Sequence, residues 1–146
     1  MDDPRKNLKM GIIFYLIAII FVVIAIFSEI VSLLSPSVSV TGLGFLGSIV
    51  LGVLAFIFAI IALVKLWQGF SAYEGKSSLV ILGKIGLILS ILIIIPILPI
   101  IGEILIGITF YDIGKIENNG SIQLGGILTA IPFISIIGLI ILLISL

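Results

Sequence analysis

Long runs of apolar residues fill most of the chain, and short polar segments separate them. The first run extends from Met10 to Leu34 and the second from Leu43 to about Gln68. A helix needs about 20 apolar residues to cross the hydrocarbon core of a bilayer, so each run predicts one transmembrane helix. The polar segments Ser35–Thr41 and Gly69–Ser78 predict the loops that follow these helices.

The third apolar run, Leu79–Tyr111, is too long for one simple span. A helix of about 33 residues would be about 50 Å long, against a hydrocarbon core of about 30 Å. Pro96 and Pro99 lie near its middle, where they remove backbone donors and disfavour helix at the residues before them. We therefore predict a tight turn between two helices, Leu79–Ile95 and about Ile97–Ile113. The alternative is one long kinked helix.

The last run, Ile122–Leu146, contains a single proline, Pro132. One proline kinks a membrane helix without ending it, so this run predicts one helix. The chain as a whole predicts a single transmembrane domain over residues 1–146, built as an all-α bundle of five transmembrane helices. Four helices, one of them long and kinked, is the alternative.

Composition supports the membrane assignment and narrows the chemistry. Hydrophobic residues make up 62% of the 146 residues and charged residues only 10%, whereas a soluble domain carries about 25% charged residues. The net charge is zero, which gives no basic patch for nucleic acid. Cysteine and histidine are absent, so disulfides, thiol chemistry and zinc or haem ligation by these residues are excluded. We expect no cofactor, no metal and no enzymatic activity.

Seven positive charges indicate the orientation, because Lys and Arg stay on the cytoplasmic side. They are Arg5, Lys6, Lys9, Lys65, Lys76, Lys84 and Lys115. With five helices and a cytoplasmic N-terminus all seven lie inside, and the C-terminus lies outside the cell membrane. With four helices Lys115 would lie outside, so the charge distribution favours five.

Two similar segments indicate an imperfect parallel repeat. IPILPIIG (Ile95–Gly102) recurs as IPFISIIG (Ile131–Gly138), and closely spaced glycines precede each copy, in Leu82–Gly86 and Leu124–Leu128. Equivalent loops of a parallel repeat face the same side of the membrane. Chance similarity between apolar segments is the alternative.

Small residues at helical spacing predict close packing between helices. They are Gly44, Ser48, Gly52, Gly86, Ser90, Gly126 and Ala130. We expect these positions to pack within the monomer, with oligomer contacts as the alternative.

Three ionisable residues fall inside the apolar runs and are candidate functional groups. We expect Glu29 and Glu103 to lie near the outer face, where they could form a proton or cation site. Alternatively, both are interfacial and contact only water or lipid headgroups. Lys84 lies close to a predicted helix end, so its stem can extend to the inner headgroups.

The segment Gly107–Gly138 carries a resemblance to a known family. From the second predicted helix onward the chain resembles an archaeal family of multi-pass membrane proteins known as domain of unknown function 973. The matching residues are Phe110, Tyr111, Gly114, Asn118, Asn119, Gly125, Gly126, Ile131, Pro132 and Phe133. Glu117 departs from the pattern, which has an aromatic residue there. The resemblance implies a thermophilic archaeal source and brings no activity, cofactor or ligand.

Two functions are compatible with these residues. The first is a structural or accessory subunit of a membrane assembly, with membrane lipid and itself or other membrane subunits as partners. The alternative is a small proton- or cation-linked carrier or pore that uses Glu103.

Overall fold

The computed structural model of the chain describes residues 3–34, 38–92 and 97–146. These residues form six α-helices and no strand, which confirms the all-helical fold. The helices are α1 (Pro4–Leu33), α2 (Val38–Ser71), α3 (Val80–Ile91), α4 (Ile97–Ile116), α5 (Gly120–Thr129) and α6 (Ser135–Ser145).

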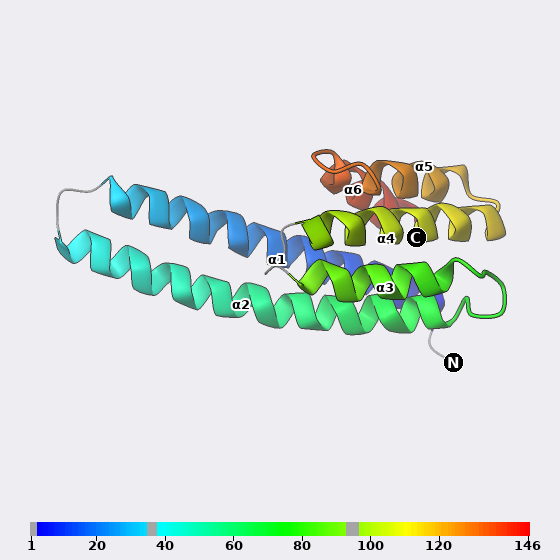
Figure 1. The fold of residues 1–146 in the computed structure, drawn as a ribbon, viewed down its shortest axis with the longest axis horizontal. Helices are drawn as coiled ribbons and strands as arrows, with labels where there is room; N and C mark the ends of the chain where they lie inside the picture. Colours follow the sequence, from blue (N-terminus) through cyan, green and yellow to red (C-terminus); the bar gives the residue numbers. More distant parts are fainter. Residues whose placement is uncertain (1–2, 35–37, 93–96) are drawn as a thin grey trace.

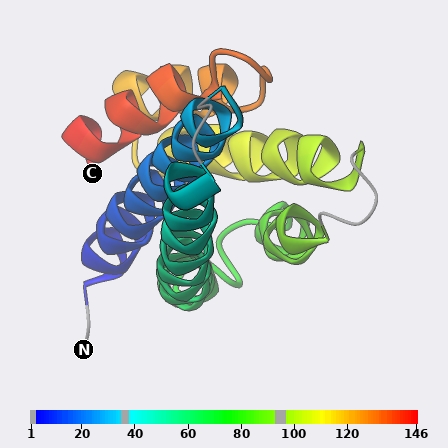
Figure 2. The ribbon, with the colours of Figure 1, turned by 90° about the vertical axis from the view of Figure 1, so that its left-hand side faces the viewer.

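A long antiparallel hairpin of α1 and α2 organises the molecule (Figure 1). Its helices have 30 and 34 residues, which corresponds to about 45 and 51 Å. The four shorter helices gather around only the half of the hairpin that contains the N-terminus. Figure 2 shows α3 beside α2 and α6 beside α1. α4 contacts both α3 and α5 and lies between them. We call the half in which all six helices meet the six-helix half.

Local sequence explains where two of the helices begin. Asp3 precedes α1, and its carboxylate accepts a hydrogen bond of 3.0 Å from the backbone N–H of Arg5, while Pro4 occupies the first helical turn. Asn119 caps α5 by accepting hydrogen bonds from two backbone N–H groups. Asn118, directly before it, has a φ of 50°, a left-handed conformation that asparagine tolerates better than most residues. The Asn118–Asn119 pair therefore ends one helix and starts the next.

The buried core lies in the six-helix half. It consists of Leu8, Ile12, Leu66, Phe70, Tyr73, Val80, Leu87, Ile106, Phe110, Ile113, Ile122, Leu139 and Leu142. In the other half α1 and α2 contact mainly each other, partly through Phe21 stacked on Phe58 at 5.5 Å. Side chains such as Phe27 and Phe45 are exposed there. An apolar surface of this extent suits lipid rather than water.

The contact between α3 and α4 depends on glycine. A Cβ at Gly102 would lie 2.6 Å from the carbonyl oxygen of Gly86 and 2.8 Å from the backbone nitrogen of Ser90. No side chain fits at such distances, so the two backbones touch directly. Gly86 and Ser90 thus pack within the chain, against Gly102. Gly102 was not among the small residues that we selected by their helical spacing.

The same arrangement joins α4 to α5. A Cβ at Gly107 would lie 2.4 Å from the backbone nitrogen of Ala130 and 2.6 Å from the carbonyl oxygen of Gly126. Gly126 and Ala130 therefore also pack within the chain. α4 lies between its two neighbours and presents Gly102 to α3 and both Gly107 and Gly114 to α5.

The small residues of α2 differ in how closely other parts of the chain pack against them. A Cβ at Gly44 would lie 2.4 Å from the Cβ of Ser32, so this position lies at a close contact with α1. The hydroxyl of Ser48 donates to the carbonyl oxygen of Phe45 in its own helix. At Gly52 a Cβ would meet nothing within 4 Å, so Gly52 is not the packing contact that we predicted.

The third apolar run forms two antiparallel helices, so the alternative of one long kinked helix is wrong. α3 ends at Ile91 and α4 begins at Ile97, with Pro99 in the first turn of α4. Pro96 lies outside the described residues. α3 has only 12 residues, fewer than the predicted 79–95.

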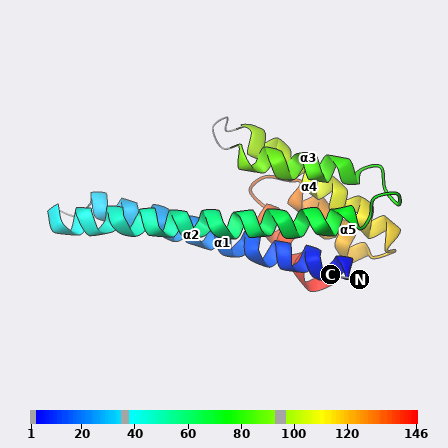
Figure 3. The same ribbon diagram turned by 90° about the horizontal axis from the view of Figure 1, so that it is seen from below.

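The prediction of one helix over Ile122–Leu146 is wrong. α5 ends at Thr129 and α6 starts at Ser135. Between them Phe133 has a φ of 68°, a left-handed conformation that reverses the chain after Pro132. α6 then packs back onto α5, because a Cβ at Gly138 would lie only 2.3 Å from the backbone nitrogen of Thr129. Both termini therefore lie at the same end of the molecule rather than at opposite ends as predicted (Figure 3).

Three helical segments in the described part of the chain are long and apolar enough to cross a membrane, instead of the predicted five. They are Pro4–Leu33, Gly44–Ser71 and Ile97–Ile116. The other helices have 10 to 12 residues and reach only about 15–18 Å. These three segments support a membrane protein.

Gly107→Ala should destabilise the protein, because the added methyl group would meet the rigid backbone of α5. We expect the free energy of unfolding to fall by about 1–3 kcal/mol, despite the better helix propensity of alanine. Gly52→Ala is the matched control and should be neutral or stabilising by up to about 1 kcal/mol. Thermal unfolding in detergent measures both. Equal melting temperatures for the two variants would contradict the proposed contact.

Candidate functional site

A cavity of about 440 Å³ lies beside the hairpin, and all six helices contribute to its wall. Its volume is in the range of small-molecule sites, about 300–1,000 Å³. Most of the lining is apolar. The polar side chains in the wall are Tyr15, Ser90, Glu103, Thr129 and Ser135.

Glu103 is the acidic group among the described residues that line this cavity. The Tyr15 hydroxyl lies 3.4 Å from its carboxylate, and the Ser135 hydroxyl is a second hydrogen-bonding neighbour. Ser90 and Thr129 instead donate to carbonyl oxygens of their own helices, both at 2.8 Å. The carboxylate is thus oriented by two neutral hydroxyl groups from α1 and α6.

No lysine or arginine stands among the described residues of the cavity wall. An ionised carboxylate in apolar surroundings is costly unless a positive charge accompanies it. Glu103 can therefore hold a proton or face a cation. No cluster of three or more His, Cys, Asp or Glu side chains occurs within residues 3–34, 38–92 and 97–146, so a metal centre of that kind is not formed there.

Glu103 lies in the six-helix half, beside Tyr15, which is the twelfth of the 30 residues of α1, whereas we expected it near the outer face. Tyr15 is six residues beyond Lys9 in α1, or about 9 Å along the axis. Glu103 is nine residues before Asp112 in α4, or about 14 Å. The acid does follow closely after the start of α4, as predicted. The difference arises because α3 is short, so α4 begins beside the middle of the hairpin.

Glu29 is not brought to this site. It is exposed on α1, fourteen residues beyond Tyr15, which is about 21 Å along the axis. The two candidate acids therefore do not lie at one depth and do not form a joint site.

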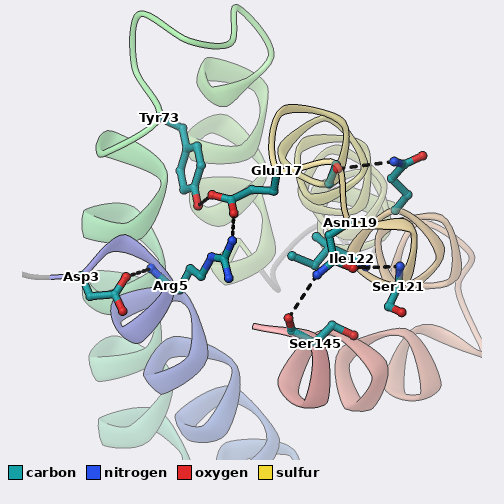
Figure 4. A network of polar contacts seen from close by, with 10 residues as sticks. Asp3, Arg5, Tyr73, Glu117, Asn119, Ser121, Ile122 and Ser145 are labelled. Carbon is teal, nitrogen blue, oxygen red and sulfur yellow. Dashed lines mark hydrogen bonds and ion pairs between the residues drawn. The ribbon is translucent and has the colours of Figure 1, made fainter.

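A second polar cluster lies at the end of the molecule that holds both termini (Figure 4). Tyr73 donates a hydrogen bond of 2.7 Å to Glu117, and Arg5 forms an ion pair with the same carboxylate. The Tyr73 hydroxyl and the Arg5 guanidinium together hold the pKa of the Glu117 carboxyl below its usual range. Burial and the adjacent carboxylate raise the pKa of the Tyr73 phenol. This cluster ties the N-terminus to the segments after α2 and α4.

The positive residues form three groups along the chain, namely 5–9, 65–84 and 115. Further contacts bring the second and third groups to the same end as the first. Lys84 pairs with Glu74, and its ammonium lies 4.7 Å from the ring centre of Trp67. Lys115 lies 4.5 Å from the ring centre of Tyr111. Lys84 therefore extends towards the polar end, as its position in the sequence suggested, and not towards Glu103.

Sequence reasoning did not single out Tyr15, Tyr73 or Arg5 as site residues. Tyr15 could have been selected from the sequence, because it is the only tyrosine inside the first apolar run. Glu117 was noticed only as a departure from the family pattern. Its pairing depends on contacts between segments far apart in the chain.

Glu117→Gln should remove part of the acid sensitivity of the fold. The folded-state pKa of Glu117 is depressed, so its contribution is present above the usual carboxyl pKa and is lost as the pH falls through the folded value. We expect the melting temperature of the wild type to fall more than that of Glu117→Gln between pH 7 and pH values below about 4. Glu29→Gln serves as the control and should keep the wild-type slope. Parallel pH profiles for the wild type and Glu117→Gln would count against this role.

Comparison with known proteins supplies a family. No curated protein and no solved structure matches the chain. A family model described as protein of unknown function (DUF973) matches residues 41–146, which cover the chain from α2 to its last residue. The match includes Glu103 and the whole of α3 to α6, whereas Tyr15 and Arg5 precede it. The chain therefore belongs to the DUF973 family of proteins of unknown function.

Proposed function

We propose that the protein is a non-enzymatic, multi-pass membrane protein that acts as a small proton- or cation-linked carrier. Glu103 is the residue that takes the ion. The observation that carries the proposal is the cavity of about 440 Å³ in which Glu103 faces Tyr15 and Ser135. No lysine or arginine of the described residues neutralises the acid there.

The depth of Glu103 supports a carrier. Binding sites of carriers lie near the middle of the bilayer, where interrupted helices meet. Glu103 lies about 14 Å along α4 from Asp112, close to the middle of a core of about 30 Å. α5 and α6 are interrupted at the turn that contains Pro132, and both contribute side chains to the cavity wall.

A structural or accessory subunit of a membrane assembly is the second candidate, and one observation favours it. Phe133 is fully exposed and occupies an irregular turn that lies beside the middle of the hairpin (Figure 1). Irregular backbone at membrane depth is tolerated where protein covers it or a water-filled cavity adjoins it. An apolar transmembrane helix of another subunit, or of a second copy, would supply that cover.

The charge distribution supports an orientation in the cell membrane. The ion pairs and aromatic contacts bring positive side chains from all three groups to one end, and positive residues stay on the cytoplasmic side. We place this end in the cytoplasm, and the C-terminus with it. Lipid surrounds the other half of the hairpin. The α3–α4 and α5–α6 pairs would represent the two copies of a parallel repeat.

Glu103→Gln should abolish ion-coupled transport. Wild-type protein in liposomes should release a proton or cation gradient, and the variant should reduce that flux to the level of empty vesicles, because an amide neither ionises nor carries a proton. A pH-sensitive or cation-sensitive dye inside the vesicles measures the flux.

Glu29→Gln is the matched control, since it removes an acid of α1 that lies far from the cavity, and it should leave the flux unchanged. Equal flux through the wild type and Glu103→Gln would rule out the carrier mechanism. Absence of flux through the wild type would leave the accessory subunit as the better explanation.

The orientation makes a separate prediction that uses the lack of cysteine in the chain. Single variants Lys6→Cys, Lys115→Cys and Leu146→Cys should all react with a membrane-impermeant maleimide in inside-out vesicles and remain unlabelled in intact cells. A Ser28→Cys variant, near the far end of α1, provides the opposite control. Labelling of Leu146→Cys from outside would contradict the shared location of the two termini.

A further inference from the structure

We infer that the Glu103 cavity binds an apolar organic cation, a single ammonium or phosphonium charge carried on a hydrophobic body. The inference rests on the proposed function, since it names the ligand class of the same site. Charge, wall chemistry and access each support it.

When Glu103 is ionised, its carboxylate needs a positive group opposite it. The carboxylate has only hydroxyl neighbours, Tyr15 and Ser135, and these orient it without neutralising it. A monovalent cation beside it would form one buried charge pair, in which the carboxylate keeps its hydrogen bonds from Tyr15 and Ser135. A neutral lipid would leave the ionised acid unmatched, and an anion would be repelled.

The wall does not suit a bare divalent metal ion but accepts an apolar body. Ca²⁺ takes six to eight oxygen ligands and Mg²⁺ takes six, whereas one carboxylate and scattered hydroxyls line this cavity. The remaining lining is aliphatic and aromatic, including Phe56 and Phe110. Aromatic faces in the wall attract an organic cation through its charge and pack against its hydrocarbon groups.

A ligand can reach the cavity from the side of the molecule. Val22, Val23, Phe56 and Ile60 line the cavity, and each of them is exposed. The wall therefore opens towards the surface that we assign to lipid. An apolar cation dissolves in a bilayer and can enter by this route, whereas a hydrated metal ion cannot.

Tetraphenylphosphonium is the probe, because it carries one positive charge on an apolar body. Equilibrium dialysis or isothermal titration with the full chain in detergent should show saturable binding. Glu103→Gln should weaken binding by about tenfold or more, since it removes the partner charge. Tetraphenylborate has the same shape with a negative charge and should not bind saturably.

Two further variants separate the site from the fold. Glu29→Gln should bind like the wild type. Ala18→Leu adds volume at a buried position of the cavity wall and keeps Glu103, so it should also lose binding. Thermal unfolding of each variant identifies those that remain folded, and only these are compared.

The outcomes distinguish this inference from the proposed function. Equal binding of tetraphenylphosphonium by the wild type and Glu103→Gln, or saturable binding of tetraphenylborate, would overturn the ligand class. Proton or inorganic cation flux that requires Glu103 without any tetraphenylphosphonium binding would overturn the inference alone. Absence of both flux and binding would overturn both.

Discussion

The direct contact of the α4 backbone with α3 and α5 is the constraint on which the described arrangement depends. Lipid provides no hydrophobic force between helices, so helices in a membrane associate through close van der Waals contact and hydrogen bonds. Gly102 and Gly107 bring the backbone of α4 against backbone atoms of both neighbours. Glu103 directly follows Gly102, so the contact that fixes α4 also sets the depth and direction of the acid. The cavity is a consequence of how this helix packs.

Helix content and the division of the third apolar run could be predicted because they depend on local rules, namely apolar length and paired prolines. The single proline of the last run could not be interpreted in this way. Pro132 is compatible with a kink or with a turn, and the outcome depends on Phe133 in a left-handed conformation and on Gly138 packing against Thr129. These are contacts between segments, which local propensity does not contain. The same limitation applies to α3, whose short length sets how far the four smaller helices extend along the hairpin.

The candidate site was partly visible in the sequence. An acid inside an apolar run is conspicuous, so Glu103 could be selected, but Glu29 was equally conspicuous and lies elsewhere. Tyr15 was not selected, because only the fold brings it to Glu103. Glu117 lies within the matched residues 41–146, whereas its partner Arg5 precedes them. The ion pair therefore links a segment outside the family match to the matched part.

The unequal height of the helices gives the molecule a cross-section that changes along its length. Among the described residues, all six helices contribute to the half at the polar end, whereas α1 and α2 alone continue through the other half. In a bilayer such a body occupies more area in one leaflet than in the opposite one and acts as a wedge. A wedge fits best where its wider end lies in the leaflet on the convex side of a bend. The protein would therefore concentrate at membrane regions with that curvature, independently of any ligand in its cavity.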